Sequence, residues 1–357
     1  MNYLLMFLAA FFASLFLTPL IRLVALKIGA VDNLELRKIH TKRIVVRLGG
    51  IAIFLAFYAT ILFFIIKGYR PLSDNSVFLI GMFFSSFIIL LLGIYDDLRG
   101  ADAKLKFFVQ TVAAVIILCF GIRINLFTNP FASGQSLSIG IWGIPLTIFW
   151  IIFITNSLNL LDGLDGLAAG VCCIILIVMF CIAFRQNDYL IMALTISLAG
   201  ATVGFLRYNF NPAKIFMGDT GSMFLGFTLS ILSIKGSHKS ATTVALLIPI
   251  IAMGLPIIDT LLAISRRILN GNNIFRADNE HIHHKLIKIG LSQKKAVLIL
   301  YGISILLGMV AFLLAVIKDE YIALLLAIVA IIFFVGVKYF LPITASLNQK
   351  NAKNKQK

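Results

Sequence analysis

The sequence predicts an all-α integral membrane protein with about eleven transmembrane helices. Of its 357 residues, 60% are hydrophobic and only 13% are charged, which is more apolar side chain than a globular core can use. The apolar residues also come in stretches of about the 20 residues that a helix needs to cross the hydrocarbon. In chain order these stretches are residues 3–26, 49–66, 76–95, 105–122, 141–157, 167–184, 189–206, 221–235, 242–264, 296–317 and 320–341.

The first and last elements set the limits of the expected domain. No Lys or Arg precedes the stretch 3–26, which is longer than the core of a signal peptide and is followed by basic residues, so we expect a retained span. The stretch 221–235 is short, and ten spans remain if it does not cross. Residues 1–346 are expected to form one transmembrane domain, followed by a basic, disordered cytoplasmic tail at 347–357.

The net charge of +16 is unevenly distributed between the two sides of the predicted bundle. If the N-terminus is outside, 22 of the 31 Lys and Arg residues fall in inward loops and in the tail. This excess predicts a cytoplasmic C-terminus by the positive-inside rule, and it favours orientation in a membrane over binding of nucleic acid. The basic loops also meet anionic lipid head groups.

The carboxylates and histidines fall on the same side. An acid near a membrane-spanning segment loses several kcal/mol of hydration, so the positions of the 15 carboxylates are informative. Asp259, inside the stretch 242–264, is the exception. Two independent observations therefore predict one active site at the cytoplasmic boundary, and its candidate residues are Asp96, Asp97, Asp102, Asp162, Asp165, Asp219, Asp278, Glu280, His281, His283 and His284.

The adjacent pair Asp96-Asp97 follows the stretch 76–95, and Lys104 and Lys106 come soon after it. Adjacent carboxylates repel each other unless a cation or a proton lies between them. A divalent metal, or a lysine that binds phosphate nearby, would relieve this repulsion. A solvated acid pair at a helix end is the alternative, and the residues alone do not separate the two.

Asn156, Asn159, Asp162 and Asp165 are spaced three residues apart. On a helix this spacing returns to nearly the same face, so the stripe could coordinate a metal, a sugar or a base. Polar packing between helices is the alternative. Asp219, flanked by glycines, either caps the next helix or binds a hard cation, and such helix starts also bind phosphates.

The longest inward loop, residues 265–295, carries clustered imidazole and guanidinium groups. These groups indicate a zinc site or an anion site. Because the loop has no cysteine, and because a diphosphate would receive charge-assisted hydrogen bonds from these groups, phosphate is favoured over zinc. The guanidinium groups belong to Arg266, Arg267 and Arg276, and the imidazoles to His281, His283 and His284.

The first inward loop contains Arg37 and His40, followed by the motif Arg47-Leu48-Gly49-Gly50. Orientation by positive charge is enough to explain this loop. A supporting role in gripping an anionic substrate is the alternative.

Taken together, these motifs resemble the polyprenyl-phosphate N-acetylhexosamine-1-phosphate transferases of glycosyl transferase family 4, over nearly the whole chain. The His281-Ile282-His283-His284 form is similar to the branch that transfers N-acetylglucosamine phosphate for teichoic acid, O-antigen or other surface polysaccharides. The peptidoglycan-precursor branch has three consecutive histidines instead. One departure is Val46, where relatives often have proline.

The resemblance implies that undecaprenyl phosphate attacks the β-phosphate of a UDP-sugar and releases UMP, with Mg²⁺, or Mn²⁺ in its place, as cofactor. It also implies a bacterial inner-membrane protein with a cytoplasmic active site, and it leaves a homodimer open. The expected catalytic residues are Asp96, Asp97 and Lys106, the expected metal ligands are Asp219 and Asn159, and the expected substrate-binding residues are Arg37, His40, Lys104, Asn159, Asp162, Asp165, Arg276, His281, His283 and His284.

Two alternatives remain. The same reaction could use UDP-N-acetylgalactosamine, a deoxy-N-acetylsugar or the muramyl-pentapeptide nucleotide, because sugar epimers differ by one hydroxyl contact. A cation-coupled transporter is the alternative of another class. It predicts acids at mid-membrane depth, whereas the acids here cluster at one boundary, with Asp259 as the exception.

Overall fold

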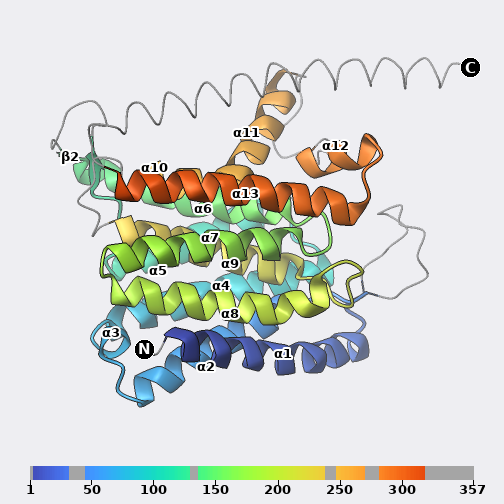
Figure 1. The fold of residues 1–357 in the computed structure, drawn as a ribbon, viewed down its shortest axis with the longest axis horizontal. Coiled ribbons are helices and arrows are strands. Elements are labelled where there is room, and N and C mark those ends of the chain that lie inside the picture. Colours follow the sequence, from blue (N-terminus) through green and yellow to red (C-terminus); the bar gives the residue numbers. More distant parts are fainter. Residues whose placement is uncertain (1–2, 32–44, 129–135, 238–246, 270–280, 318–357) are drawn as a thin grey trace, which may run out of the picture.

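Helices that lie side by side make up nearly all of the described structure (Figure 1). The computed structural model describes residues 3–31, 45–128, 136–237, 247–269 and 281–317. Its helices are α1 (Tyr3–Lys27), α2 (Gly50–Ile66), α3 (Arg70–Ser73), α4 (Ser76–Arg99), α5 (Ala103–Cys119), η1 (Gly140–Trp142), α6 (Gly143–Leu161), α7 (Leu167–Arg185), α8 (Tyr189–Asn209), α9 (Gly218–Ser237), α10 (Leu247–Ala252), α11 (Gly254–Leu269), α12 (Ile282–Lys288) and α13 (Gln293–Val316).

The prediction of a helical membrane protein is confirmed. Within the described ranges, six helices are long and apolar enough to cross a membrane: α1, α4, α6 together with η1, α7, α8 and α13. Large apolar side chains such as Leu4 and Phe16 on α1 are exposed, as expected where lipid is the solvent. The expected span 320–341 and the tail 347–357 lie outside the described residues.

Several helices extend beyond their predicted ends, and two of them carry predicted site residues. α4 continues to Arg99 rather than ending at residue 95, and α6 continues to Leu161 rather than to residue 157. The apolar stretch ends where side chains become polar, but the backbone hydrogen bonds of the helix continue past that point. Asp96, Asp97 and Asn159 therefore lie on the last turns of helices rather than in loops.

The expected span 242–264 is broken within the residues that are described. α10 ends at Ala252, and α11 starts at Gly254 and leaves the direction of the bundle (Figure 1). Pro256 explains part of the break, because it has no N–H to donate to the carbonyl of Ala252. The sequence predicted one span over 242–264, whereas the described part of this segment contains α10 and the start of α11.

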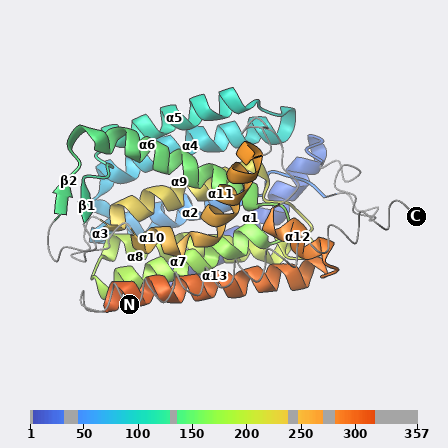
Figure 2. The same ribbon diagram turned by 90° about the horizontal axis from the view of Figure 1, so that it is seen from above.

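Helix α9 lies in the middle of the bundle, between α4 and α5 on one side and α7 and α13 on the other (Figure 2). It packs against α2, α4, α6, α7 and α8, and every residue from Thr220 to Ile234 is buried. Gly50 of α2 and Gly93 of α4 face α9 so closely that a Cβ atom on either would overlap its backbone. The first turn of α9 is thus fixed by two neighbouring helices.

The segment before α2 lies against the segment before α9. Val46 pairs in parallel with Ile215, and the Phe216 N–H donates to the Val46 carbonyl at 2.8 Å. The Gly49 N–H donates back to the Phe216 carbonyl at 3.1 Å. Two motifs that are far apart in the sequence, Arg47 to Gly50 and Phe216 to Ser222, therefore meet at one end of the bundle.

A short hairpin between α5 and α6 was not predicted. Its strands β1 (Leu126–Thr128) and β2 (Ser136–Ser138) are antiparallel, with Phe127 opposite Leu137. The hairpin has only three residues in each strand, so the fold class is all-α as predicted.

Candidate active site

Asp97, on the last turn of α4, holds the start of α9. Its carboxylate accepts hydrogen bonds from the Asp219 N–H at 3.0 Å, the Thr220 N–H at 3.1 Å and the Thr220 hydroxyl at 2.6 Å. The first N–H groups of a helix have no partner within the helix, and their partial positive charge suits a carboxylate. Gly218, at φ +70°, lets the chain enter α9 beside this carboxylate.

Lys106, near the start of α5, lies between two carboxylates from different helices. Its Nζ atom is 2.7 Å from Asp219 Oδ2 and also pairs with Asp96. Asp96 in turn accepts the Ala101 N–H at 2.6 Å. With Asp97 beside Asp219, three acids meet one ammonium group, so the cluster carries an excess of negative charge if all three are ionised.

Asp219 is the more accessible of the two carboxylates that pair with Lys106. Its side chain is 31% exposed, against 9% for Asp96. Asp219 also lines the polar cavity described below, whereas Asp96 does not.

The two asparagines of the polar stripe on α6, Asn156 and Asn159, have different surroundings. Asn156 Nδ2 donates to Gln110 Oε1 at 2.7 Å, which ties α6 to α5. Asn159 Nδ2 donates to the Ser222 hydroxyl at 2.9 Å, one turn into α9, and the amide of Asn159 also adjoins the Asp219 carboxylate. Of the two asparagines, Asn159 is the one at the carboxylate cluster.

The turn after α6 forms one wall of a polar cavity of about 70 Å³. Asp165 Oδ2 accepts from Asn211 Nδ2 and from the Ala213 N–H, both at 3.1 Å, so this carboxylate also fixes the segment after α8. The residues that line the cavity are Arg47, Asp97, Asp162, Leu164, Asp165, Asn209, Phe216, Gly218 and Asp219.

The three histidines begin α12 and lie close to one another. The rings of His281 and His283 are 5.7 Å apart and nearly parallel, and those of His283 and His284 are 4.2 Å apart. The imidazole of His283 packs so closely on Gly163 that a Cβ atom there would overlap it. The histidine helix is therefore in contact with the turn that carries Asp162 and Asp165.

Asp259 belongs to the histidine group and is not an isolated acid. Its Oδ2 atom is 2.9 Å from His281 Nδ1, and its Oδ1 atom accepts the Ile282 N–H at 2.9 Å. The sequence placed Asp259 within a span, where it supported a transport path. The break before α11 instead brings it to the same group of residues as the other acids.

The structure brings most of the predicted site residues together. Asp96, Asp97, Lys106, Asn159 and Asp219 form one cluster, and the other members of the group adjoin it through the cavity and the Gly163 contact. Lys104 is exposed on α5. Arg37, His40 and Arg276 lie outside the described residues.

Sequence reasoning missed several contributors. Thr220 and Gln110 gave no signal, because their partners are more than 40 residues away in the chain. Asp259 could have been found from its position between Pro256 and the following arginines, which is an unusual place for an acid in an apolar stretch. Arg47 was recognised as part of a motif but not as a residue that lines the cavity.

The donor set fits a hard cation better than a soft one. The cluster offers carboxylate and amide oxygens, which suit Mg²⁺ or Mn²⁺. The described residues include no group of three or more His, Cys, Asp and Glu side chains already arranged to hold a metal. Lys106 already provides positive charge between Asp96 and Asp219, so a cation would share these carboxylates with an ammonium group.

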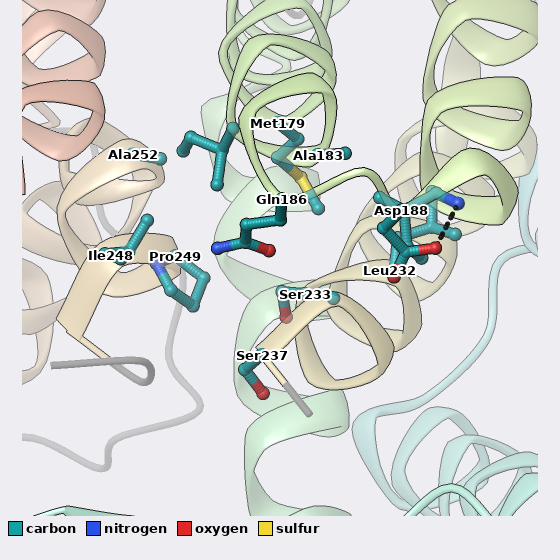
Figure 3. Close-up of a pocket in the computed structure, with 13 residues that line it drawn as sticks. Met179, Ala183, Gln186, Asp188, Leu232, Ser233, Ser237, Ile248, Pro249 and Ala252 are labelled. Carbon is teal, nitrogen blue, oxygen red and sulfur yellow. Dashed lines mark hydrogen bonds between the residues drawn. The ribbon is translucent and has the colours of Figure 1, made fainter. Parts of the chain in front are cut away.

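Figure 3 shows a second cavity, which is lined by the last turns of α7 and α9, the start of α8 and α10. Because the carboxylate cluster lies at the start of α9, this cavity is at the opposite end of the bundle. Its volume is about 40 Å³, and most of its lining is apolar, from Met179 on α7 to Pro249 and Ala252 on α10. Asp188 lies at its edge, where its carboxylate caps α8 by accepting the Ile191 N–H at 3.3 Å. The cavity contains no converging set of charged groups, so we assign the candidate active site to the other end.

The chain matches the class of membrane proteins described as glycosyl transferase family 4, over residues 79–237. It is 41% identical over 344 residues, 96% of this chain and 92% of the relative, to a probable undecaprenyl-phosphate N-acetylglucosaminyl 1-phosphate transferase of Bacillus subtilis. It is 33% identical over 328 residues, 85% of this chain and 80% of the relative, to a decaprenyl-phosphate N-acetylglucosaminephosphotransferase of Mycobacterium tuberculosis. The chain belongs to glycosyl transferase family 4.

A more distant relative is a phospho-N-acetylmuramoyl-pentapeptide-transferase of Clostridium beijerinckii, at 32% identity over 299 residues, 80% of this chain and 88% of the relative. The resemblance found in the motifs is therefore confirmed, including the branch that is more similar. These relatives are all named as transferases, so the transporter alternative gains no support.

Proposed function

We propose that this protein transfers N-acetylglucosamine-1-phosphate from UDP-N-acetylglucosamine to undecaprenyl phosphate, releasing UMP and starting a lipid-linked surface polysaccharide. The observation that carries the proposal is the cluster of Asp96, Asp97, Asp219 and Lys106, which three helices bring together at one end of the bundle. The names of the relatives support the reaction and the acceptor.

The residues suit phosphoryl transfer because that reaction requires in-line positioning and neutralisation of charge more than covalent participation. Lys106 would stabilise the phosphoryl oxygens as charge develops on them. Asp96 lies beside Lys106 and would face the acceptor phosphate, whereas Asp97 would keep Asp219 in place. A lipid phosphate is already an anion near neutral pH, so no general base is required.

The donor would lie across the cavity and the histidine group. Asp162 and Asp165 would line the nucleotide pocket, and Arg47 at the cavity edge adds a guanidinium that suits phosphate oxygens. His281, His283 and His284 would hold the diphosphate or the sugar, with Arg276 from the loop before them. Lys104, near the start of α5, would support the binding of anions, together with Arg37 and His40.

We further propose that Mg²⁺, or Mn²⁺ in its place, binds at Asp219 with Asn159 nearby. When bound, the cation would neutralise negative charge on the diphosphate of the donor. The excess of carboxylates over ammonium groups in the cluster supports this assignment.

The site would lie at the cytoplasmic face of the bacterial inner membrane. The distribution of Lys and Arg supports this orientation, with the N-terminus outside and eleven spans in all. The prenyl chain of the acceptor would then remain in lipid while its phosphate meets a water-soluble nucleotide at the boundary. A homodimer is compatible with this arrangement.

The test is release of UMP by the purified protein with undecaprenyl phosphate and a panel of UDP-sugars, including UDP-N-acetylgalactosamine and the muramyl-pentapeptide nucleotide. We expect release that requires both lipid and Mg²⁺, is highest with UDP-N-acetylglucosamine, and is abolished by EDTA and by Asp219→Ala. Release that is highest with another UDP-sugar would change the donor, and no release from any donor by folded protein would refute the proposal.

A further inference from the structure

Asp259 uses both of its carboxylate oxygens to fix one end of the histidine helix. Oδ2 binds His281 Nδ1 and Oδ1 binds the Ile282 N–H, each at 2.9 Å. Asp259 is 2% exposed and His281 is 4% exposed, so water does not compete strongly for these bonds. The pair joins α11 to α12, which are separated in the sequence by residues 270–281.

The contact also sets the chemistry of the imidazole. An ionised carboxylate only accepts hydrogen bonds, so Nδ1 of His281 must carry a proton. Nε2, on the other side of the ring, is then the atom available for a further partner. A carboxylate that orients an imidazole in this way fixes both its tautomer and its direction.

The bond to Asp259 is one of the contacts that hold the start of α12. α12 has only seven residues, and its N-cap residue, His281, makes no side-chain hydrogen bond to the helix. The Ile282 N–H instead bonds to Asp259, on another helix. His283 then packs against Gly163, beside Asp162. Asp259 thus connects the broken helix to the wall of the candidate site.

We propose that Asp259 is a positioning residue that holds the Nδ1-protonated ring of His281 and the start of α12 in place, so that the histidines can bind a phosphate oxygen of the donor nucleotide. This inference rests on the proposed function. It adds a residue to the site that acts through His281 and touches no substrate itself.

The first variant is Asp259→Asn, which keeps the size of the side chain and one oxygen for the Ile282 N–H. Its amide NH₂ would face Nδ1 as a donor and would move the ring proton to Nε2. We expect UMP release to fall at least about tenfold, as is typical when the carboxylate partner of a functional imidazole is removed. Asp259→Glu, which keeps the charge, is expected to recover part of this loss.

A double-mutant cycle with His281→Gln separates positioning from structural support. If Asp259 acts through His281, Asp259→Asn lowers release by less than about twofold once His281 is already changed. Losses that multiply instead would mean that Asp259 supports the fold without acting through His281, and would overturn the inference.

Asp188→Asn is the matched control, because Asp188 is also a buried aspartate that caps a helix, at the far end of the bundle (Figure 3). We expect a similar change in thermal stability and release within about twofold of the unaltered protein. An equal loss of release in this control would show that the assay reports general destabilisation, and would overturn the inference.

A measurement independent of turnover is ¹⁵N NMR of the histidine rings in detergent micelles. The resonances assigned to His281 by their loss in His281→Gln are expected to show a protonated Nδ1 in the unaltered protein and a protonated Nε2 in Asp259→Asn. An unchanged tautomer would overturn the inference even if activity falls. No release by the unaltered protein, by contrast, would refute the proposed function and this inference with it.

Discussion

At the scale of single residues, Asp97 and its neighbour Asp96 make different contacts. Three hydrogen bonds reach the Asp97 carboxylate from Asp219 and Thr220, at the first turn of α9. Asp96, the adjacent residue in the sequence, instead pairs with Lys106. Two acids that look equivalent in the sequence therefore act on different elements.

This difference predicts that the two acids respond differently to amide substitution. Asp97→Asn would turn an NH₂ group toward the donors of α9, so we expect a loss of about 1–3 kcal/mol in stability and a large loss of UMP release. Asp96→Asn should reduce release with a smaller change in stability. Thermal unfolding and UMP release measure the two effects. Full turnover in both variants would contradict the assignment of this pair.

Lys106 provides a second residue-scale prediction. Lys106→Met would leave Asp96 and Asp219 close together without their ammonium partner, and we expect UMP release to fall by about 10² or more. The same change should strengthen the dependence of thermal stability on Mg²⁺, because the repulsion between the two carboxylates is then relieved mainly by the metal. Melting temperatures with and without Mg²⁺ would measure this. An equal shift in both proteins would argue against a shared cation site.

The sequence identified the acids of the cluster but not their connections. Asp96, Asp97, Asn159 and Asp219 were predicted because charged and amide groups are conspicuous at the ends of apolar stretches. The role of Asp97 as a cap could not be predicted, because its partners lie more than 120 residues away. Asp259 was interpreted as an exception because its partner His281 lies 22 residues further along the chain, beyond the end of α11.

At the scale of elements, the contact between α4 and α9 determines where Asp219 lies. A Cβ atom at Gly93 would be 2.9 Å from the carbonyl carbon of Asp219 and still closer to Thr220. The helices can approach this closely only because position 93 has no side chain. Gly50 has the same role between α2 and α9.

We therefore expect Gly93→Ala to displace the first turn of α9. The overlap should lower stability by about 1–3 kcal/mol and should also reduce UMP release, because Asp219 moves relative to Lys106. Gly302→Ala is the matched control: Gly302 is also helical, on α13, and a Cβ atom there meets no atom within 4 Å. We expect the control to be neutral or slightly stabilising. Thermal unfolding and UMP release of both variants provide the comparison.

Most helices could be predicted from apolar length alone, and the exceptions have physical reasons. Hydropathy located α1, α2, α7 and α8 nearly to the residue, since their ends coincide with polar turns. The break between α10 and α11 was missed because the prediction considered only hydrophobicity. Gly254 and Pro256 disturb the helix but do not add a polar side chain that would interrupt the apolar stretch. α9 was predicted to be short because its Gly, Ser and Thr residues lower its hydropathy. These small residues nevertheless fit a helix that is buried among other helices.

At the scale of the whole molecule, the orientation in the membrane follows from charge and can be tested directly. With the N-terminus outside and eleven spans, a fluorescent protein fused after residue 357 should fluoresce, because it folds in the cytoplasm. An alkaline phosphatase fused after Ile317 should be active, because α13 then ends outside. The opposite pattern would invert the predicted topology, and two cytoplasmic fusions would remove the span 320–341.

Because other helices enclose α9, the thickness of the membrane should have little effect on the position of Asp219. Bilayers of different thickness act on helices that contact lipid, by tilting them or by deforming the lipid around them. α1 and α13 present apolar side chains outward, whereas α9, which carries Asp219, is buried from Thr220 to Ile234. A change in lipid chain length should therefore affect how the long-chain acceptor enters between the outer helices, while the carboxylates keep their arrangement.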